Sequence, residues 1–195
     1  MSDDTWNCGI ECPEDWIPLP LEPGIDLGAW ALEQAKELAA ATSEEVDAEA
    51  LMYDLRERAA DSRGREPVFA FGLYPEGFDT ALAVLEVDVI HPDAEVPSIT
   101  LDWITEVFAT GDFQEPEVER ATVPAGPAVR IRQGLAGRGT GESGERSLME
   151  TVTYGVRPPG IESAVMVLVS WTAPGLVDLM TAAADQIVHT LKITT

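Results

Sequence analysis

"SAVMVLVSW", residues 163–171, is the stretch that decides the fold of this chain. Apolar side chains occupy odd and even positions alike, whereas a strand with one solvated face alternates apolar and polar residues. The run therefore predicts a central β-strand that is covered by helices above and below.

Patterns with a period of two residues predict the rest of the sheet. "PVFAFGLY", a Tyr-Pro-Glu-Gly turn with proline at its second position and "TALAVLEVDVI" predict a β-hairpin over residues 67–90. Three more strands are expected at about 117–123, 127–135 and 147–157. Pro124-Ala-Gly-Pro127 has the composition of a turn that reverses the chain between the first two of these. We expect one mainly antiparallel sheet over residues 67–171.

Helical periodicity surrounds these strands. Asp26 is expected to cap a helix over about 27–41. Thr42, with Glu45 three residues later, has a capping-box pattern and predicts the start of a second helix that runs to about Asp61, with Gly64 as its stop. Further helices are expected over about 99–110 and from Leu176 to the region of Leu191.

The expected organisation is a proline-rich acidic arm over 1–25 and a single globular domain over 26–195. This domain would contain a helical pair over 26–64, and a sheet with a C-terminal helix over 67–195. Trp6, Trp16 and Leu19 are expected to pin the arm onto the domain. The fold class is α+β, with a mainly antiparallel sheet and helices on both faces.

A resemblance to a known fold family rests on the second half of the chain. The proline-glycine turn into "PAVRIR", a long loop, two strands ending in "VSW" and a terminal helix ending in "IVHTL" resemble the PsbP-like fold over about 67–195. That fold is shared by an extrinsic photosystem II subunit, a Ran-binding nuclear protein and small bacterial proteins of unknown role. The resemblance implies an α/β/α sandwich that acts as an accessory or scaffold protein. It transfers no functional residue to this chain, which has an extra helical pair and lacks an export signal.

The charge is strongly unbalanced, with 35 acidic residues against 12 basic ones and a net charge of −23. A surface of this kind repels nucleic acid and anionic lipid headgroups, because binding to phosphates needs clustered lysine and arginine. We expect no nucleic-acid or membrane partner and, as one interpretation, a basic protein partner. The other interpretation is that the acidic surface keeps the protein soluble. The N-terminus has no signal-peptide pattern, and no apolar run approaches the ~18 residues of a membrane span, so a cytoplasmic location is expected.

Arg130 and Arg132 are the candidate site residues. In "AVRIRQ" they share one face of a strand, and we expect carboxylates of neighbouring strands to hold them, either Glu86 and Asp88 or Glu119. The alternative is a clamp for an anionic ligand, because the guanidinium fork fits carboxylates and phosphates.

The sequence gives little support for a metal, redox or nucleotide-binding site. Cys8 and Cys12 have neither the redox spacing nor the further ligands of a zinc site, so no metal or redox role is expected. His91 and His189 have no partner in the sequence pattern, and His189 is interpreted as a partner of the helix dipole. Gly139 to Gly144 matches a dinucleotide fingerprint, but a strand is expected after it where the fingerprint requires a helix, so no cofactor is expected. Residues 136–146 are instead predicted to be a flexible loop.

Two functions therefore remain. The first is a non-enzymatic accessory or protein-interaction module with an acidic surface, since no catalytic constellation is found. The second is a small-molecule or lipid-binding domain, with or without enzymatic activity, whose pocket is bordered by Arg130 and Arg132. A cleft on which both guanidinium groups converge would favour the second function.

Overall fold

A computed structural model describes residues 6–43, 45–111, 113–136 and 148–194 of the chain. The predicted loop over 136–146 lies outside the described residues except for Ala136, and so does the stretch from Gly139 to Gly144. The chain forms two compact units. Unit 1 comprises Met1–Cys12 and Asp88–Thr195, and unit 2 comprises Pro13–Val87.

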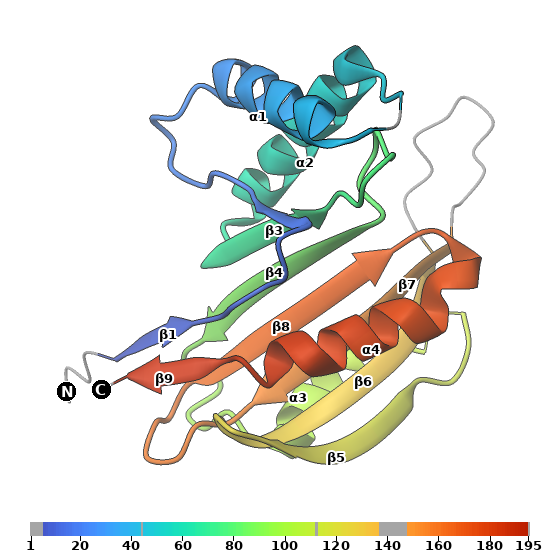
Figure 1. Ribbon diagram of the computed structural model, residues 1–195. Coiled ribbons are helices and arrows are strands. Elements are labelled where there is room, and N and C mark those ends of the chain that lie inside the picture. Colours follow the sequence, from blue (N-terminus) through green and yellow to red (C-terminus); the bar gives the residue numbers. More distant parts are fainter. Residues whose placement is uncertain (1–5, 44, 112, 137–147, 195) are drawn as a thin grey trace. The chain divides into compact units, whose positions relative to one another are not determined.

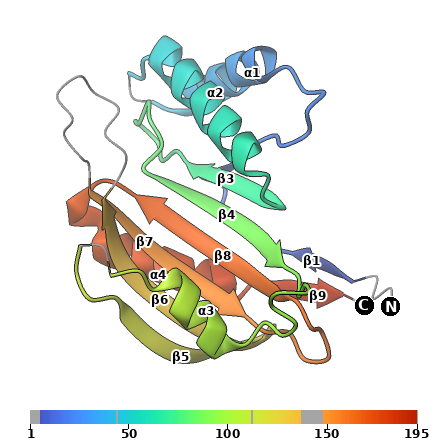
Figure 2. The same cartoon turned by 180° about the vertical axis from the view of Figure 1, so that it is seen from behind.

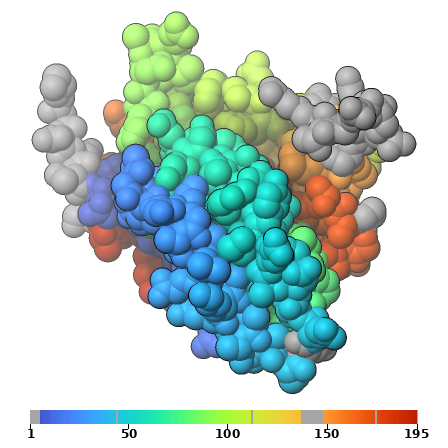
Figure 3. Space-filling model, turned by 90° about the horizontal axis from the view of Figure 1, so that it is seen from above, coloured from blue at the N-terminus to red at the C-terminus, as the bar shows by residue number. Residues whose placement is uncertain are grey.

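Unit 2 combines a short sheet with a pair of helices (Figure 1). In chain order its elements are β2 (Trp16–Pro18), α1 (Leu27–Ala41), α2 (Ala48–Arg65), β3 (Phe69–Leu73) and β4 (Ala83–Ile90), the last of which runs past the boundary of the unit. β3 pairs antiparallel with β2 on one side and with β4 on the other. α1 and α2 pack against each other along their length (Figure 3). Of the three residues expected to pin the N-terminal segment, Trp16 and Leu19 are buried at 4% exposure each, and Trp6 is partly buried.

The α1 helix begins where the sequence predicts, because the Asp26 side chain accepts hydrogen bonds from the N–H groups of Gly28 and Ala29. The predicted start of α2 is wrong. Asp47 caps this helix by accepting from two N–H groups of its first turn. Thr42 donates its hydroxyl to Glu76 and ends α1. A six-residue junction therefore separates two helices that were expected to be nearly continuous.

The end of α2 also differs from the prediction. Gly64 lies inside the helix, which continues to Arg65. Glu66 then takes the left-handed conformation at φ 58°, and its N–H bonds to the carbonyls of Ser62 and Arg63. Glycine is the usual residue at such a position, because a side chain is strained there. Gly64 therefore predicted the end of α2 two residues too early.

Unit 1 is a sandwich of helices and an antiparallel sheet. Its elements are β1 (Asn7–Gly9), α3 (Leu101–Phe108), β5 (Glu117–Val123), β6 (Gly126–Ala136), β7 (Leu148–Val156), β8 (Ala164–Trp171), a short 3₁₀ turn (Pro174–Leu176), α4 (Val177–Val188) and β9 (Lys192–Thr194). β8, β7, β6 and β5 lie in this order, and each neighbouring pair is antiparallel. The three strands expected at about 117–123, 127–135 and 147–157 are confirmed, and so is the strand expected at the apolar run 163–171.

Helices cover opposite faces of this four-stranded part of the sheet. α3 packs on one face, where Ile104 contacts a core that includes Val129, Ile131 and Met166. α4 packs on the other face against β7 and β8 (Figures 1 and 2). Gly155 is needed on the α3 face, because a Cβ there would lie 2.6 Å from Ile104 Cγ2. The α+β class with an antiparallel sheet and helices on both faces is therefore confirmed.

The turn at Pro124 is a two-residue loop. Val123 and Gly126 face each other in the register, so Pro124 and Ala125 connect β5 to β6, as the sequence predicts. β1 and β9 were not predicted as strands. They pair antiparallel from Asn7 opposite Thr194 to Gly9 opposite Lys192.

Candidate functional site

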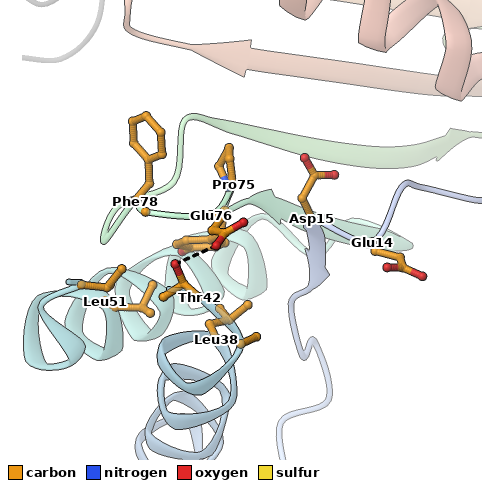
Figure 4. Close-up of a pocket in the computed structure, with 12 residues that line it drawn as sticks. Glu14, Asp15, Leu38, Thr42, Leu51, Pro75, Glu76 and Phe78 are labelled. Atoms are coloured by element: carbon orange, nitrogen blue, oxygen red, sulfur yellow. Dashed lines mark hydrogen bonds between the residues drawn. The ribbon is translucent and has the colours of Figure 1, made fainter. Parts of the chain in front are cut away.

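A groove in unit 2 is the candidate functional site (Figure 4). It has a volume of about 290 Å³ and lies where α1, the α1–α2 junction and α2 face the β3–β4 turn and the residues before β2. Its twelve lining residues are Glu14, Asp15, Leu38, Ala41, Thr42, Val46, Leu51, Tyr74, Pro75, Glu76, Gly77 and Phe78. Most of these side chains are apolar, three are acidic and none is basic.

Tyr74 forms part of the groove wall and is held in one position. Its hydroxyl donates to Asp54 Oδ2 at 2.9 Å, and the same oxygen accepts from the N–H of Ala81. Burial, with the Asp54 charge beside it, raises the pKa of Tyr74 far above its usual value. Gly72 makes room for the ring, since a Cβ there would lie 2.6 Å from Tyr74 Cε2. The phenol is thus a protonated structural group.

Glu76 lies on the rim of the groove and joins two of its sides. Oε1 accepts from the Thr42 hydroxyl and from the N–H of Ser43, both at 3.2 Å, so the carboxylate connects the β3–β4 turn to the α1–α2 junction. The turn itself runs from Pro75 to Phe78, whose N–H bonds to the Pro75 carbonyl. Gly77 at φ 84° occupies the position where a type II turn requires a positive φ. The turn is therefore one residue later than predicted.

The rim is acidic and exposed. Glu14, Asp15 and Glu76 all line the groove (Figure 4), and within the described residues no ion pair joins any of them to a cation. Phe78, which also lines the groove, has 47% of its surface exposed. An aromatic side chain and three carboxylates next to an apolar floor form a surface that attracts cations and also contacts apolar groups.

Arg130 and Arg132, the residues singled out from the sequence, lie in unit 1 on β6. Arg130 is 12% exposed and contacts Asp185 of α4 at 3.1 Å and Glu119 of β5 at 3.5 Å. Arg132 pairs with Glu117, which lies directly opposite it on β5, and this hydrogen bond lowers the pKa of the Glu117 carboxyl.

The predicted cross-strand pairing with Glu119 is confirmed by these contacts. Pairing of the arginines with Glu86 is wrong, because both carboxylate oxygens of Glu86 accept from Arg65 of α2. The alternation of apolar and charged residues correctly predicts that the two arginines share a face. It could not show that Glu119 lies on the adjacent strand while Glu86 lies beside a helix.

The cysteines and histidines form no site in the described part of the chain, where no three His, Cys, Asp or Glu side chains cluster as metal ligands would. Cys8 and Cys12 are free thiols. Burial raises the pKa of Cys8 and raises that of Cys12 to about 12, so Cys12 is a poor nucleophile at neutral pH. His91 Nδ1 contacts the Ser163 hydroxyl, and His189 Nδ1 donates to the Asp185 carbonyl within the last turn of α4.

Comparisons with known proteins identify a fold and no family. No family model matches the chain, and no curated protein matches its sequence. Among solved structures, LpqN of Mycobacterium tuberculosis, described as involved in cell envelope biogenesis, matches with a TM-score of 0.53 at 13% identity over 98% of this chain and 85% of LpqN. The Ran-binding protein Mog1p of Saccharomyces cerevisiae matches with a TM-score of 0.39 at 10% identity over 64% of this chain and 77% of Mog1p. The likeness to LpqN supports the α+β fold.

None of the helices in the described residues combines the length and the apolar character that crossing a bilayer requires.

The groove was missed at the sequence level because its residues come from four separate segments. Leu38 and Leu51 belong to two helices that the sequence predicts, and Pro75 to Gly77 belong to a predicted turn. A usable signal does exist: Glu14 and Asp15 immediately precede the buried Trp16, and an exposed Phe78 follows the turn. Acidic residues next to aromatic residues at two places in one unit could have suggested a common surface.

Proposed function

We propose that this protein is a non-enzymatic interaction module, and that the groove of unit 2 binds a segment of a basic partner protein. The segment would place an apolar side chain on the floor formed by Leu38 and Leu51. Lysine or arginine residues on either side of it would meet Glu14, Asp15 and Glu76. The observation that carries the proposal is an apolar groove whose charged lining residues are all acidic.

The size of the groove favours a side chain over a cofactor. About 290 Å³ is just below the ~300–1,000 Å³ of clefts that enclose drug-sized molecules. The polar groups of the wall are also already engaged, since Tyr74 is bonded to Asp54. What the groove presents to a ligand is therefore apolar surface and rim carboxylates.

The charge of the whole chain supports the same partner. A net charge of −23 creates a field that accelerates encounters with basic proteins and opposes acidic ones. We further propose that this encounter takes place in the cytoplasm, as the amino-acid pattern of the chain suggests. The association rate should then fall as salt increases, because salt screens the exposed rim.

Fluorescence anisotropy with two labelled peptides tests the proposal. Each peptide carries one central leucine, which is flanked by four lysines in the first and by four glutamates in the second. The full-length protein should bind the lysine peptide and not the glutamate peptide. A third peptide, with alanine in place of leucine, should bind more weakly than the lysine–leucine peptide because it leaves the floor uncovered.

A matched pair of double variants separates the groove from the general surface charge. Glu14→Gln/Asp15→Asn removes two carboxylates from the rim, and Glu33→Gln/Glu57→Gln removes two exposed carboxylates from α1 and α2 outside it. The first should weaken binding by roughly two- to fivefold for each carboxylate, as exposed ion pairs do. The second should leave binding nearly unchanged. Equal losses in both, or equal binding of the alanine peptide, would overturn the proposal.

A further inference from the structure

The β5 strand forms an open edge of the sheet in unit 1. It is the last strand in the order and, among the residues that the structure describes, pairs only with β6 (Figures 1 and 2). The pairing is continuous over seven residues, from Glu117 opposite Arg132 to Val123 opposite Gly126, and contains no bulge. A long, regular edge of this kind exposes backbone groups to which another strand can bond.

The register shows which residues of β5 turn these groups outward. Pro127 lies opposite Thr122 and has no N–H, and its carbonyl accepts from Arg157 on the side of β7. Thr122 and Pro127 are therefore a non-hydrogen-bonded pair. Because such pairs alternate with bonded pairs in an antiparallel ladder, Val118 and Arg120 are non-bonded as well. The N–H and C=O groups of Val118, Arg120 and Thr122 face away from β6.

The charged side chains of β5 form ion pairs with residues of the neighbouring strand β6 and of helix α3. Glu117 pairs with Arg132 and Glu119 with Arg130, both on β6, while Arg120 pairs with Asp102 of α3. Val118 remains 40% exposed between them. In a chain with a net charge of −23, β5 is thus locally close to neutral. Unpaired charges on an edge repel an added strand, and here they are neutralised.

The β2 strand at the edge of the sheet in unit 2 offers few backbone N–H groups to an added strand, in contrast to β5. β2 has three residues and ends at Pro18, which has no N–H to donate. The N–H of Trp16 is also engaged, since it bonds to the Pro13 carbonyl. One edge of the molecule is therefore blocked by its sequence, whereas the β5 edge is left available.

We propose that the β5 edge binds an extended segment of a partner protein, which adds to the sheet as a further strand. The segment would place an apolar, β-branched side chain beside Val118 and would be neutral or basic. A second copy of the chain is a poor occupant, because two molecules that each carry a net charge of −23 repel each other. Backbone bonds to Val118, Arg120 and Thr122 would give affinity, and the contact with Val118 would give selectivity.

Arg130 and Arg132 have a role at this edge even though the chain is strongly acidic. Without Arg130 and Arg132, the two carboxylates of β5 would stand unpaired along the edge. The added strand would then have to approach uncompensated negative charge. The arginines thus make the edge able to accept a partner strand.

The test uses a capped seven-residue peptide in which valine alternates with threonine or lysine, together with the full-length protein. Residue-resolved amide hydrogen exchange should show slower exchange at Val118, Arg120 and Thr122 when the peptide is present. A peptide with proline at its centre should not produce this protection. Protection that appears instead on β1, β2 or β9 would overturn the proposal.

Two substitutions at one position provide the matched control. Val118→Pro removes one outward N–H and leaves the bonds to β6 in place, and it should weaken peptide binding about tenfold, the equivalent of one backbone hydrogen bond. Val118→Thr keeps the N–H and should bind nearly as well as the original protein. If Val118→Pro does not fold, Thr122→Pro removes the next outward N–H and carries the same expectation.

Further outcomes separate this site from the groove and from self-association. Glu14→Gln/Asp15→Asn should leave binding of the strand peptide unchanged even though it weakens binding of the lysine peptide. Equal binding by Val118→Pro and Val118→Thr would overturn the proposal. Sedimentation that reveals a dimer, with the outward amides of β5 protected in the absence of peptide, would also overturn it and would identify a second copy as the occupant.

Discussion

Tyr154 donates a hydrogen bond to Oδ1 of Asp185 at 2.7 Å, and this bond joins β7 to the last turn of α4. The same oxygen accepts from Nε of Arg130 on β6 at 3.1 Å. One carboxylate oxygen of α4 therefore holds two strands of the sheet, through a tyrosine that is 4% exposed and an arginine whose side chain is 12% exposed.

Replacing Tyr154 by phenylalanine removes one of these bonds and keeps the ring. The free energy of unfolding should fall by about 1 to 2 kcal/mol, because the lost bond is to a charged group that retains Arg130 as a partner. Urea denaturation measures this value. Tyr53→Phe is the control, since Tyr53 is 57% exposed and should tolerate the change without measurable loss. Equal effects at both positions would contradict the assignment.

The two arginines of β6 should differ in their importance for stability. Arg130→Gln removes a nearly buried cation from Asp185 and Glu119, and we expect a loss of about 1.5 to 3 kcal/mol in the free energy of unfolding. Arg132→Gln affects a pair whose acidic partner Glu117 is 56% exposed, and the loss should be about 0 to 1 kcal/mol. Chemical denaturation of the two single variants measures both losses in the free energy of unfolding. Indistinguishable values would show that burial of the pair is unimportant.

Stability should fall at alkaline pH. Burial and the bonds to Asp54 and Asp185 raise the pKa of Tyr74 and Tyr154 in the folded protein. Both phenols hold their proton more tightly when folded, so the stabilisation is complete below the unfolded value of about 10 and is lost as the pH rises above it. Cys12, with its pKa raised to about 12, adds a loss in the same direction.

Urea midpoints measured at about pH 8, 10 and 11 should therefore decrease at the two higher values. A Tyr74→Phe/Tyr154→Phe variant should show a shallower decrease over the same interval, although it is less stable at neutral pH. If the original protein and the double variant lose the same stability over this pH interval, the two tyrosines do not cause the loss.

Two glycines should respond to alanine in opposite directions. A Cβ at Gly64 meets nothing within 4 Å, and the residue lies inside α2, so Gly64→Ala should raise the free energy of unfolding by about 0.5 to 1 kcal/mol. A Cβ at Gly155 would collide with Ile104, so Gly155→Ala should lower it by about 1 to 3 kcal/mol. Thermal unfolding of the two variants should thus give melting temperatures on either side of that of the original protein. A loss at Gly64 would mean that glycine is needed to end the helix.

The positions of most elements could be predicted because their signals are local. The alternation of "AVRIRQ" and the apolar run at 163–171 specify strands without reference to other residues. The start of α2 was misplaced because Thr42 and Asp47 are both good N-cap residues. A contact from Glu76, 34 positions away, engages Thr42 and leaves Asp47 as the cap. Non-local hydrogen bonds of this kind have no sequence period.

The candidate site was less accessible to prediction than the fold. The alternation of the sequence correctly predicted that Arg130 and Arg132 share one face of a strand, and it suggested Glu119 as an ion-pair partner. It could not predict the contact of Arg130 with Asp185, because Asp185 lies on a helix 55 residues further along the chain. The groove depends on how the β3–β4 turn meets the α1–α2 junction. That meeting is fixed by Glu76 and by the packing of Tyr74 over Gly72, and neither contact leaves a pattern in the sequence.

The pairing of β1 with β9 sets an order of events during synthesis. Residues 13–87 form a unit with its own core, so all of unit 2 is available to fold once these residues have left the ribosome. β1 leaves the ribosome before unit 2, but its partner Lys192–Thr194 follows more than 100 residues after unit 2 in the chain. β1 therefore cannot pair with β9 until the chain has been made as far as Thr194. Until then, the groove of unit 2 can be complete while the sheets of unit 1 still lack this pairing.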